Sequence, residues 1–258
     1  MRVTFLGTGS AMPTGERFQT GILLESAGGD LLVDCGSGVL HGLQRTDVGY
    51  EGIDAVLLTH HHLDHVSDLM ALLKARWLAG ATDLTIAGPQ GTAELVTDLL
   101  GVHEYMRDRM DLTFREVGPE AFSLAGFDVT GFEVRHSMYC LAYRFAESES
   151  SASSERDRPA FVFSGDTEAF PGLVEFADGA AVLAHDCSFP DSVDVDNHPT
   201  PSELGRTLAE ADGEVGRVYL THLYPHTDGR HEEMLDSVAD RYDGDVRFAS
   251  DGLSLDID

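Results

Sequence analysis

Cysteine and long apolar runs are scarce in this sequence, and each scarcity excludes a class of protein. The 258 residues include three cysteines, Cys35, Cys140 and Cys187, which are odd in number and far apart. They do not predict the disulfide framework of a small secreted protein. No apolar run reaches the roughly 18 residues of a membrane-spanning helix, and the chain enters a strand at Val3 without a signal-peptide core. We therefore expect a cytoplasmic protein that has no contact with a membrane.

Basic residues are few as well. The chain has 17 Lys and Arg, of which Lys74 is the single lysine, against 45 Asp and Glu, so its net charge is −28. At about 1 M salt the Debye length falls to roughly 3 Å, which screens the self-repulsion of such a surface. This composition favours a halophilic, archaeal type of protein. It also argues against a large nucleic-acid-binding surface at ordinary salt, because acidic side chains repel phosphates. This argument weakens in molar salt, which screens the repulsion.

The most informative stretch is Thr59-His60-His61-His62-Leu63-Asp64-His65, which has the order His-x-His-x-Asp-His. Imidazole and carboxylate groups are the ligands that Zn²⁺ and similar divalent ions bind. Ile53–Leu58 precedes the run and reads as a buried strand, so the run is expected just beyond the carboxyl end of that strand. A surface cluster of histidines is the alternative, and the spacing favours the metal site.

Further ligand-type residues follow other predicted strands. The strands are Asp30–Val33, Phe127–Arg135, Ala160–Ser164, Ala181–Ala184 and Val218–Thr221, and they are followed by Asp34, His136, Asp166, His185-Asp186 and His222. Other expected elements are a strand at Val3–Leu6, a hairpin of Gly21–Ser26 with Asp30–Val33, and helices at Ser67–Leu78 (capped by Ser67), Thr92–Leu100 and Ser202–Ala211. Side chains at strand ends converge on one rim of a sheet, so a shared site is predicted there.

Together these motifs resemble the metallo-β-lactamase superfamily, and within it the branch of ribonuclease Z and related arylsulfatase-like hydrolases. The opening Phe5-Leu6-Gly7-Thr8-Gly9-Ser10 is similar to the start of ribonuclease Z chains, and the likeness extends to the strands near Arg247-Phe248. The resemblance implies an α/β fold, the αββα sandwich, in which helices flank two mixed β-sheets packed face to face. It implies one such domain over residues 1–258. Relatives often pair, so we also expect a homodimer.

The resemblance further implies a dinuclear metal centre. Its ligands would be His60, His62 and His136 for the first ion, Asp64, His65 and His222 for the second, and Asp166 as the bridge between them. Two Zn²⁺ ions are expected, although a site of nitrogen and oxygen ligands also accepts Mn²⁺ or Fe. Such a centre hydrolyses phosphodiesters, with Asp64 orienting the nucleophile.

The resemblance to ribonuclease Z also implies roles for four more residues, which would support the metal ligands or donate a proton. Asp34 would brace the site from behind the ligands, although a carboxylate that only satisfies turn amides is an equally good interpretation. His185-Asp186-Cys187-Ser188 resembles a His-Glu-Ala-Thr segment of ribonuclease Z, so His185 and Asp186 are expected beside the ligands. His198 in His-Pro-Thr resembles the histidine that faces the leaving group, and it would act with Asp64 as a catalytic residue.

One departure from ribonuclease Z concerns its arm for transfer RNA. Asp166 comes only 30 positions after His136, and the short acidic stretch Glu147–Arg158 stands where the arm is expected. The sequence therefore predicts a zinc-dependent phosphodiesterase or ribonuclease that lacks the arm and acts on a phosphodiester or RNA. A 3′ exonuclease is one form that this activity could take. The alternatives are a non-phosphate hydrolase of the arylsulfatase or lactonase kind, and a metal-binding protein without catalysis.

Overall fold

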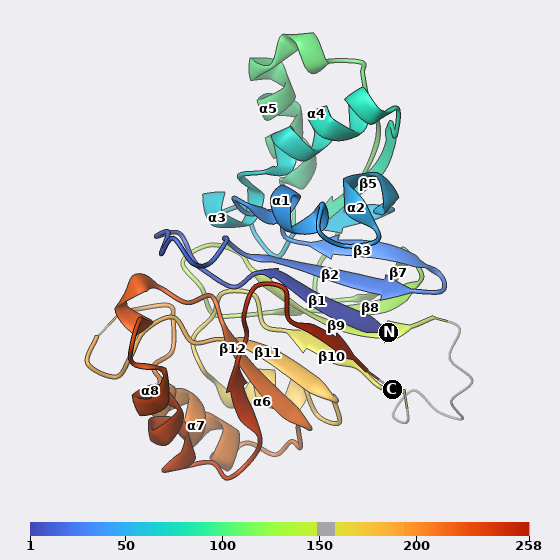
Figure 1. Ribbon diagram of the computed structural model, residues 1–258. Coiled ribbons are helices and arrows are strands. Elements are labelled where there is room, and N and C mark those ends of the chain that lie inside the picture. The colour runs from blue at the N-terminus through green and yellow to red at the C-terminus, as the bar shows by residue number, and fades with distance from the viewer. Residues whose placement is uncertain (149–157, 194, 258) are drawn as a thin grey trace.

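Two β-sheets stacked face to face form the centre of the molecule (Figure 1). The structure is a computed structural model that describes residues 1–148, 158–193 and 195–257. The first sheet has the strand order β14-β1-β2-β3-β4-β5-β6. Its strands are β1 (Arg2–Gly7), β2 (Gly21–Ser26), β3 (Gly29–Val33), β4 (Ala55–Leu57), β5 (Asp83–Gly88), β6 (Asp111–Glu116) and β14 (Ser254–Asp256). Strands β3 to β6 are parallel, and β14, β1, β2 and β3 pair antiparallel.

The second sheet is also mixed and has the strand order β13-β12-β11-β10-β9-β8-β7. Its strands are β7 (Ala121–Leu124), β8 (Phe127–Glu133), β9 (Leu141–Glu147), β10 (Phe161–Phe163), β11 (Val182–Asp186), β12 (Arg217–Thr221) and β13 (Val246–Phe248). Strands β10 to β13 are parallel, whereas β7 to β10 pair antiparallel. The predicted pair of mixed sheets is confirmed.

Apolar side chains alternate between the two faces of the inner strands. In β3, Leu31 and Val33 pack against the other sheet, whereas Leu32 packs under the helices. A fully buried side chain of this size contributes about 1.5–3 kcal/mol. A slip of one residue would exchange the two faces of the strand, so the pattern helps to fix the register that places the strand ends.

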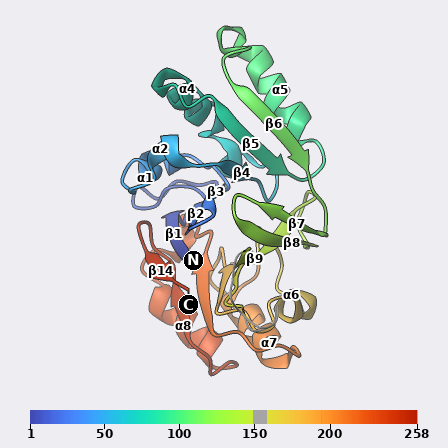
Figure 2. The ribbon, with the colours of Figure 1, turned by 90° about the vertical axis from the view of Figure 1, so that its right-hand side faces the viewer.

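Helices cover both outer faces of the stacked sheets (Figures 1 and 2). The first sheet is covered by α1 (Val39–Leu43), α2 (Gly49–Gly52), α3 (Leu63–Val66), α4 (Leu69–Ala79), α5 (Thr92–Val102) and η1 (Glu104–Met106). The second is covered by α6 (Pro171–Phe176), α7 (Pro201–Glu210) and α8 (His231–Ala239), with η3 (Pro225–Thr227) in a loop beside it. The αββα arrangement expected from the resemblance is therefore present. Within the described residues, no helix is both long and apolar enough to cross a membrane.

Most predicted elements are confirmed, and three of the boundaries that differ have a clear cause in the hydrogen bonding. Ser67 is not a helix N-cap: it closes α3 by donating to the Leu63 carbonyl, and α4 begins after Asp68. Strand β8 ends at Glu133, because the Val134 amide bonds across a loop to Cys140. Strand β11 continues through Asp186, because this residue still pairs with β12.

The strand ends that carry the predicted ligands meet at one end of the sandwich. Parallel strands β3 and β4 end there in the first sheet, as do β10, β11 and β12 in the second. The chain after β8 arrives at the same end, where the Leu141 amide bonds to the Thr59 carbonyl. Short helix α3 lies at this end, drawn at the left in Figure 1.

Candidate metal centre

Seven predicted ligands lie together at this end in two groups that share Asp166. The first group is His60, His62, His136 and Asp166, and the second is Asp64, His65, Asp166 and His222. Within each group the ligand atoms lie within 4.8 Å of one another. The residues come from the loop between β4 and α4 and from the ends of β8, β10 and β12, so the fold assembles them from four separate segments.

In the first group three imidazole nitrogens face one another. His62 Nδ1 lies 3.0 Å from His60 Nε2 and 3.1 Å from His136 Nε2. The Asp166 carboxylate approaches from the other side, with Oδ2 3.7 Å from His60 Nε2. A neutral imidazole has only one N–H, so three converging nitrogens expose several lone pairs to the same small volume. A cation among them would satisfy these lone pairs at once.

The second group contains buried polar atoms without hydrogen bonds. Among the described residues, His65 Nε2 and Asp166 Oδ1 have no hydrogen-bond partner, although they lie 3.3 Å apart. His222 Nε2 lies 3.1 Å from Asp64 Oδ2 and 3.2 Å from Asp166 Oδ2. A buried polar atom left unsatisfied costs about 1–3 kcal/mol. A divalent ion that prefers nitrogen and oxygen would satisfy both atoms, so the donor set fits Zn²⁺, Mn²⁺ or Fe.

The charges of the two groups suit metal binding. Burial alone would raise the pKa of Asp166, but His222, His65 and His60 outweigh it and hold that pKa well below its usual value. Burial, with the nearby His65, lowers the pKa of His60 well below its usual value. Burial would also lower the pKa of His65, but Asp166 and Asp34 raise it instead. A metal ion at His65 would compete with a proton for the ring nitrogen.

A carboxylate and a hydroxyl behind the ligands hold two of the imidazoles in place. Asp34 Oδ2 accepts from His65 Nδ1 at 2.7 Å and from Thr59 Oγ1 at 2.8 Å, and Asp34 Oδ1 accepts from the Thr59 amide at 2.8 Å. Thr59 Oγ1 also lies 3.0 Å from His60 Nδ1. The structure places Asp34 beside the ligands rather than on turn amides. The backbone of Asp34 is left-handed, with φ 59°.

A second carboxylate orients His198. Asp186 Oδ2 accepts from His198 Nδ1 at 2.6 Å, and the His198 ring stacks on His222 with centroids 5.4 Å apart. Burial would lower the pKa of His198, but Asp186 raises it to about 9. His198 is therefore protonated at neutral pH, with its Nδ1 bound to Asp186.

The remaining histidines are placed differently. His185 is buried in β11 on the face of Leu183, toward the helices, and belongs to neither group. Its Nδ1 contacts the Asp186 carbonyl at 2.6 Å. His61 turns away from the groups, because its Nε2 lies 2.8 Å from Thr92 Oγ1 at the start of α5.

Two hydroxyls at the site were not predicted from the sequence. Thr59 lies directly before the first histidine of the motif, and Ser188 lies two residues after Asp186. Both are fully buried and contact candidate ligands. A hydroxyl directly before a ligand in sequence is the signal that would have found Thr59, whereas Ser188 has no candidate ligand beside it in the sequence.

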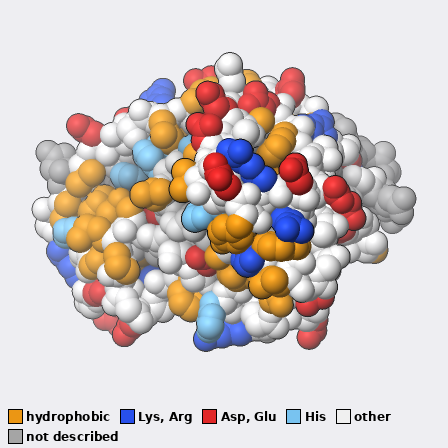
Figure 3. Space-filling view, turned by 90° about the horizontal axis from the view of Figure 1, so that it is seen from above, with side chains coloured by type: hydrophobic (Ala, Val, Ile, Leu, Met, Phe, Trp, Pro, Cys, Tyr) orange, Lys and Arg blue, Asp and Glu red, His pale blue; other side chains and the backbone are white. Residues whose placement is uncertain are grey.

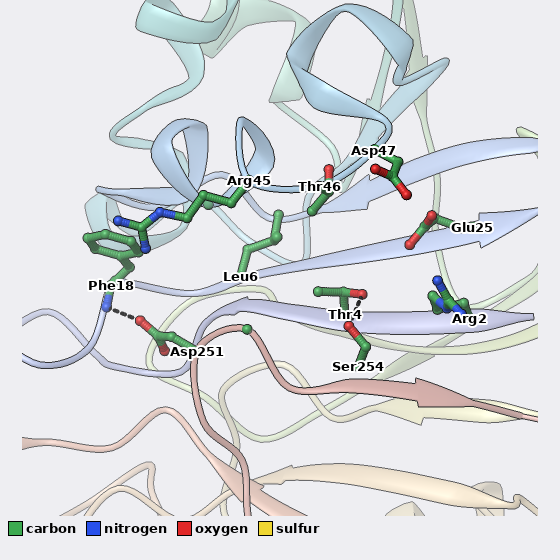
Figure 4. A pocket seen from close by; sticks show the side chains of 12 residues that line it. Arg2, Thr4, Leu6, Phe18, Glu25, Arg45, Thr46, Asp47, Asp251 and Ser254 are labelled. Carbon is green, nitrogen blue, oxygen red and sulfur yellow. Dashed lines mark hydrogen bonds between the residues drawn. The ribbon is translucent and has the colours of Figure 1, made fainter.

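A separate cavity of about 250 Å³ lies along β1, between the α1 region and β14 (Figure 4). Some of its polar side chains are engaged with one another or with the backbone: Thr4 bonds to Ser254, and Asp251 accepts from the amides of Phe18 and Thr8. Arg2 pairs with Asp256. None of the seven ligands lines this cavity, so the metal groups remain the candidate site.

The comparisons with known proteins agree with this geometry. The family model described as Anti-Pycsar protein Apyc1 matches residues 1–234. The chain belongs to the Anti-Pycsar protein Apyc1 family, within the metallo-β-lactamase superfamily. This Apyc1-family chain is also 32% identical over 290 residues to ribonuclease Z of Mycolicibacterium paratuberculosis, with 100% of this chain and 99% of that protein covered. It is 27% identical over 305 residues to ribonuclease Z of Haloferax volcanii, with 100% and 95% covered.

A solved structure of similar fold is also a metallo-β-lactamase fold protein. The metallo-β-lactamase fold protein YhfI of Bacillus subtilis superposes with a TM-score of 0.81 at 26% identity, covering 99% of each chain. The short form of human tRNase Z superposes with a TM-score of 0.77 at 21% identity, covering 100% of each. The resemblance to the ribonuclease Z branch is confirmed for this Apyc1-family chain. The ribonuclease Z alignments extend over 290 and 305 positions, so those relatives carry insertions that its 258 residues lack.

Proposed function

We propose that this chain is a dinuclear, zinc-dependent phosphodiesterase that acts on small or unstructured phosphodiesters, such as nucleotide diesters and single-stranded RNA. The observation that carries the proposal is the pair of ligand groups sharing Asp166 beside His198, whose Nδ1 bonds to Asp186. His60, His62 and His136 would hold one ion, and Asp64, His65 and His222 the other. Mn²⁺ or Fe could replace zinc, because the donor set accepts all three.

When bound, two such ions would neutralise charge on a phosphodiester under attack and lower the pKa of the attacking water toward about 7. Asp64 would orient that water by accepting its hydrogen bond. His198 would give its proton to the departing oxygen, since Asp186 holds the ring by Nδ1 and leaves Nε2 to donate. Asp64 would therefore act on the attacking water, and His198 would act as the general acid.

The described residues support a small substrate. Strands β9 and β10 pair antiparallel, with Phe145 opposite Phe161, so Ser148 and Arg158 lie at the end of the sheet away from the metal groups. The rest of the acidic stretch predicted from the sequence, residues 149–157, lies outside the described residues. A connection of that length offers little room for an arm that grips a folded RNA, and the net charge of −28 opposes the binding of a large polyanion at ordinary salt.

Exposed apolar side chains are found in the chain segments that carry candidate site residues. Leu63, which stands between two candidate ligands, is 78% exposed. Other exposed side chains are Met138 and Tyr139, just after His136, Val195, three residues before His198, and Met12, in the loop after β1. These five are most of the eight large exposed hydrophobics in the described part of the chain. Figure 3 shows hydrophobic side chains gathered near histidines at the left end of the molecule, where α3 lies in Figure 1. Apolar and aromatic contacts suit a nucleobase or an aryl group beside the phosphodiester.

The test is a substrate panel for the metal-loaded protein in roughly 2 M KCl, a salt level that screens its charge. The panel contains bis(p-nitrophenyl) phosphate, a 3′,5′-cyclic mononucleotide, an unstructured RNA, a 3′-extended transfer RNA precursor, an aryl sulfate and a lactone. We expect hydrolysis of the small diesters, and stepwise shortening of the RNA if the enzyme is also a 3′ exonuclease. Asp64→Ala should abolish each activity.

Three results would redirect the proposal. A discrete cut at the 3′ end of the transfer RNA precursor would show that the arm is dispensable. Hydrolysis of an aryl sulfate or a lactone alone would make the chain a non-phosphate hydrolase. Zinc binding with no turnover on any substrate would leave a metal-binding protein without catalysis.

A further inference from the structure

The hydroxyl of Ser188 stands at the junction of the second ligand group and the proton donor. Ser188 is fully buried in the loop after β11. Its Oγ lies 2.6 Å from Asp186 Oδ1, 2.9 Å from His222 Nδ1, 2.9 Å from the His222 carbonyl and 3.3 Å from His198 Nδ1. The other oxygen of Asp186 accepts from His198. One hydroxyl therefore touches a candidate metal ligand and also the carboxylate that orients His198.

The number of protons on these groups fixes the direction of the bonds. Ser188 has one hydroxyl proton, and a carboxylate oxygen and a carbonyl oxygen both compete for it. The carboxylate is closer and charged, so the proton goes to Asp186 Oδ1. His222 Nδ1 must then be a donor, because two facing lone pairs at 2.9 Å would repel. A neutral His222 with its hydrogen on Nδ1 has a free lone pair on Nε2, the atom that faces Asp64 and Asp166.

The backbone holds this arrangement firmly. The Cys187 amide bonds to the Thr221 carbonyl, and the Tyr224 amide bonds to the Ser188 carbonyl, so the loops after β11 and β12 are joined on both sides of His222. His222 itself has a left-handed backbone, with φ 59°. A conformation that is uncommon for such a residue persists only where surrounding bonds fix it.

We propose that Ser188 is a positioning residue that holds His222 in its metal-binding tautomer and links the second metal subsite to the Asp186–His198 pair. This inference rests on the proposed function. The chain of bonds runs from His222 Nδ1–H to Ser188 Oγ, from Ser188 O–H to Asp186, and from His198 Nδ1–H to the same carboxylate. Removing the hydroxyl leaves His222 Nδ1 without its acceptor and Asp186 with a free oxygen.

Zinc titration of the full chain in 2 M KCl tests the proposal without relying on activity. For Ser188→Ala we expect one of two zinc ions to bind 10–100-fold more weakly, the usual effect of losing a partner behind a metal ligand. Ser188→Thr, which keeps the hydroxyl, should restore the affinity. Ser10→Ala is the matched control, because Ser10 is buried and its Oγ has no hydrogen-bond partner among the described residues. Unchanged zinc affinity in Ser188→Ala would overturn the proposal, as would a Ser188→Thr variant as weak as Ser188→Ala.

A second measurement tests the link to His198. With zinc at saturation, Ser188→Ala should lose more turnover on a dinucleotide, whose alkoxide leaves poorly, than on bis(p-nitrophenyl) phosphate, whose phenolate needs little help from an acid. Equal losses on the two substrates would contradict the link. A wild-type chain that binds zinc but hydrolyses neither substrate would contradict the proposed function, whereas the zinc comparison would still decide the role of Ser188 at His222.

Discussion

Replacing Asp34 by Asn is the most informative change behind the metal groups. Asp34 is fully buried and accepts three hydrogen bonds: two from Thr59 and one from His65. Asn is similar in size, and it tolerates a left-handed backbone well, so the φ of 59° remains accessible. The substitution therefore changes the hydrogen-bond chemistry with little change in shape.

The expected loss of zinc affinity follows from the number of hydrogen-bond acceptors at position 34. The amide group of Asn has one oxygen, so its NH₂ must replace one of the two carboxylate oxygens and face a donor. If the amide oxygen keeps the Thr59 amide, His65 Nδ1 loses its acceptor, and its hydrogen moves to Nε2, which faces the second ligand group. We expect 10–100-fold weaker zinc binding, or about 1.4–2.7 kcal/mol. In the metal-free protein His65 also loses a buried charge partner, which costs about 3 kcal/mol and lowers Tm by roughly 10 °C.

The assay is zinc titration with thermal unfolding in 2 M KCl, for Asp34→Asn and for Asp68→Asn as the matched control. Asp68 Oδ2 accepts from the amides of Gly38 and Leu40 at 2.9 and 3.0 Å and bonds to no histidine. Asp68→Asn should lower stability and leave zinc affinity unchanged. If Asp34→Asn bound zinc as tightly as the wild type, the carboxylate would be a turn residue only, and the reasoning would be refuted.

Three further predictions concern the acid, the pH and the salt. His198→Gln should lower kcat about 10²–10⁴-fold on a dinucleotide and far less on bis(p-nitrophenyl) phosphate, with unchanged zinc content; equal losses would show that His198 is not the acid. Because the folded-state pKa of His198 is raised from 6.5 to about 9, its stabilisation of the metal-free fold is complete below about pH 6.5 and is lost as the pH rises through 9. Urea unfolding should show this loss, about 3 kcal/mol at most, in the wild type and not in His198→Asn. The net charge of −28 predicts that Tm rises between 0.1 and 2 M KCl; a flat or falling Tm would contradict the halophilic interpretation.

The sequence predicted the ligand groups because their positions follow from local rules. Apolar strands can be read from residue pattern, and a polar residue directly after a parallel strand lies at the rim of the sheet. His60 and His222 are found in this way, whereas His136 lies three residues past β8, which pairs antiparallel with both of its neighbours. The resemblance to ribonuclease Z then assigned them to two ions, and the structure brings the same residues together. Their roles as ligands, the homodimer and the cytoplasmic location stay predictions.

Features that depend on tertiary contacts were not predictable in the same way. The choice of Asp68 rather than Ser67 before α4 depends on a bond from Ser67 to Leu63 and on amides 28 and 30 residues away in the chain. His185 was expected beside the ligands, but β11 continues through it and turns its ring toward the helices. The hydroxyls of Thr59 and Ser188 gain their roles only when loops from distant strands meet. Residue type indicates which atoms can bind, whereas packing decides which of them do.

The most direct test of a dinuclear phosphodiesterase is to measure metal content and hydrolysis in the same samples of wild type and Asp166→Ala. Elemental analysis of protein purified without chelators in 2 M KCl gives the ions per chain, and bis(p-nitrophenyl) phosphate gives the activity. We predict two zinc ions and hydrolysis for the wild type, and loss of at least one ion and of nearly all activity for Asp166→Ala, because Asp166 belongs to both groups. Hydrolysis by wild-type protein stripped of metal, or full activity of Asp166→Ala, would contradict the account.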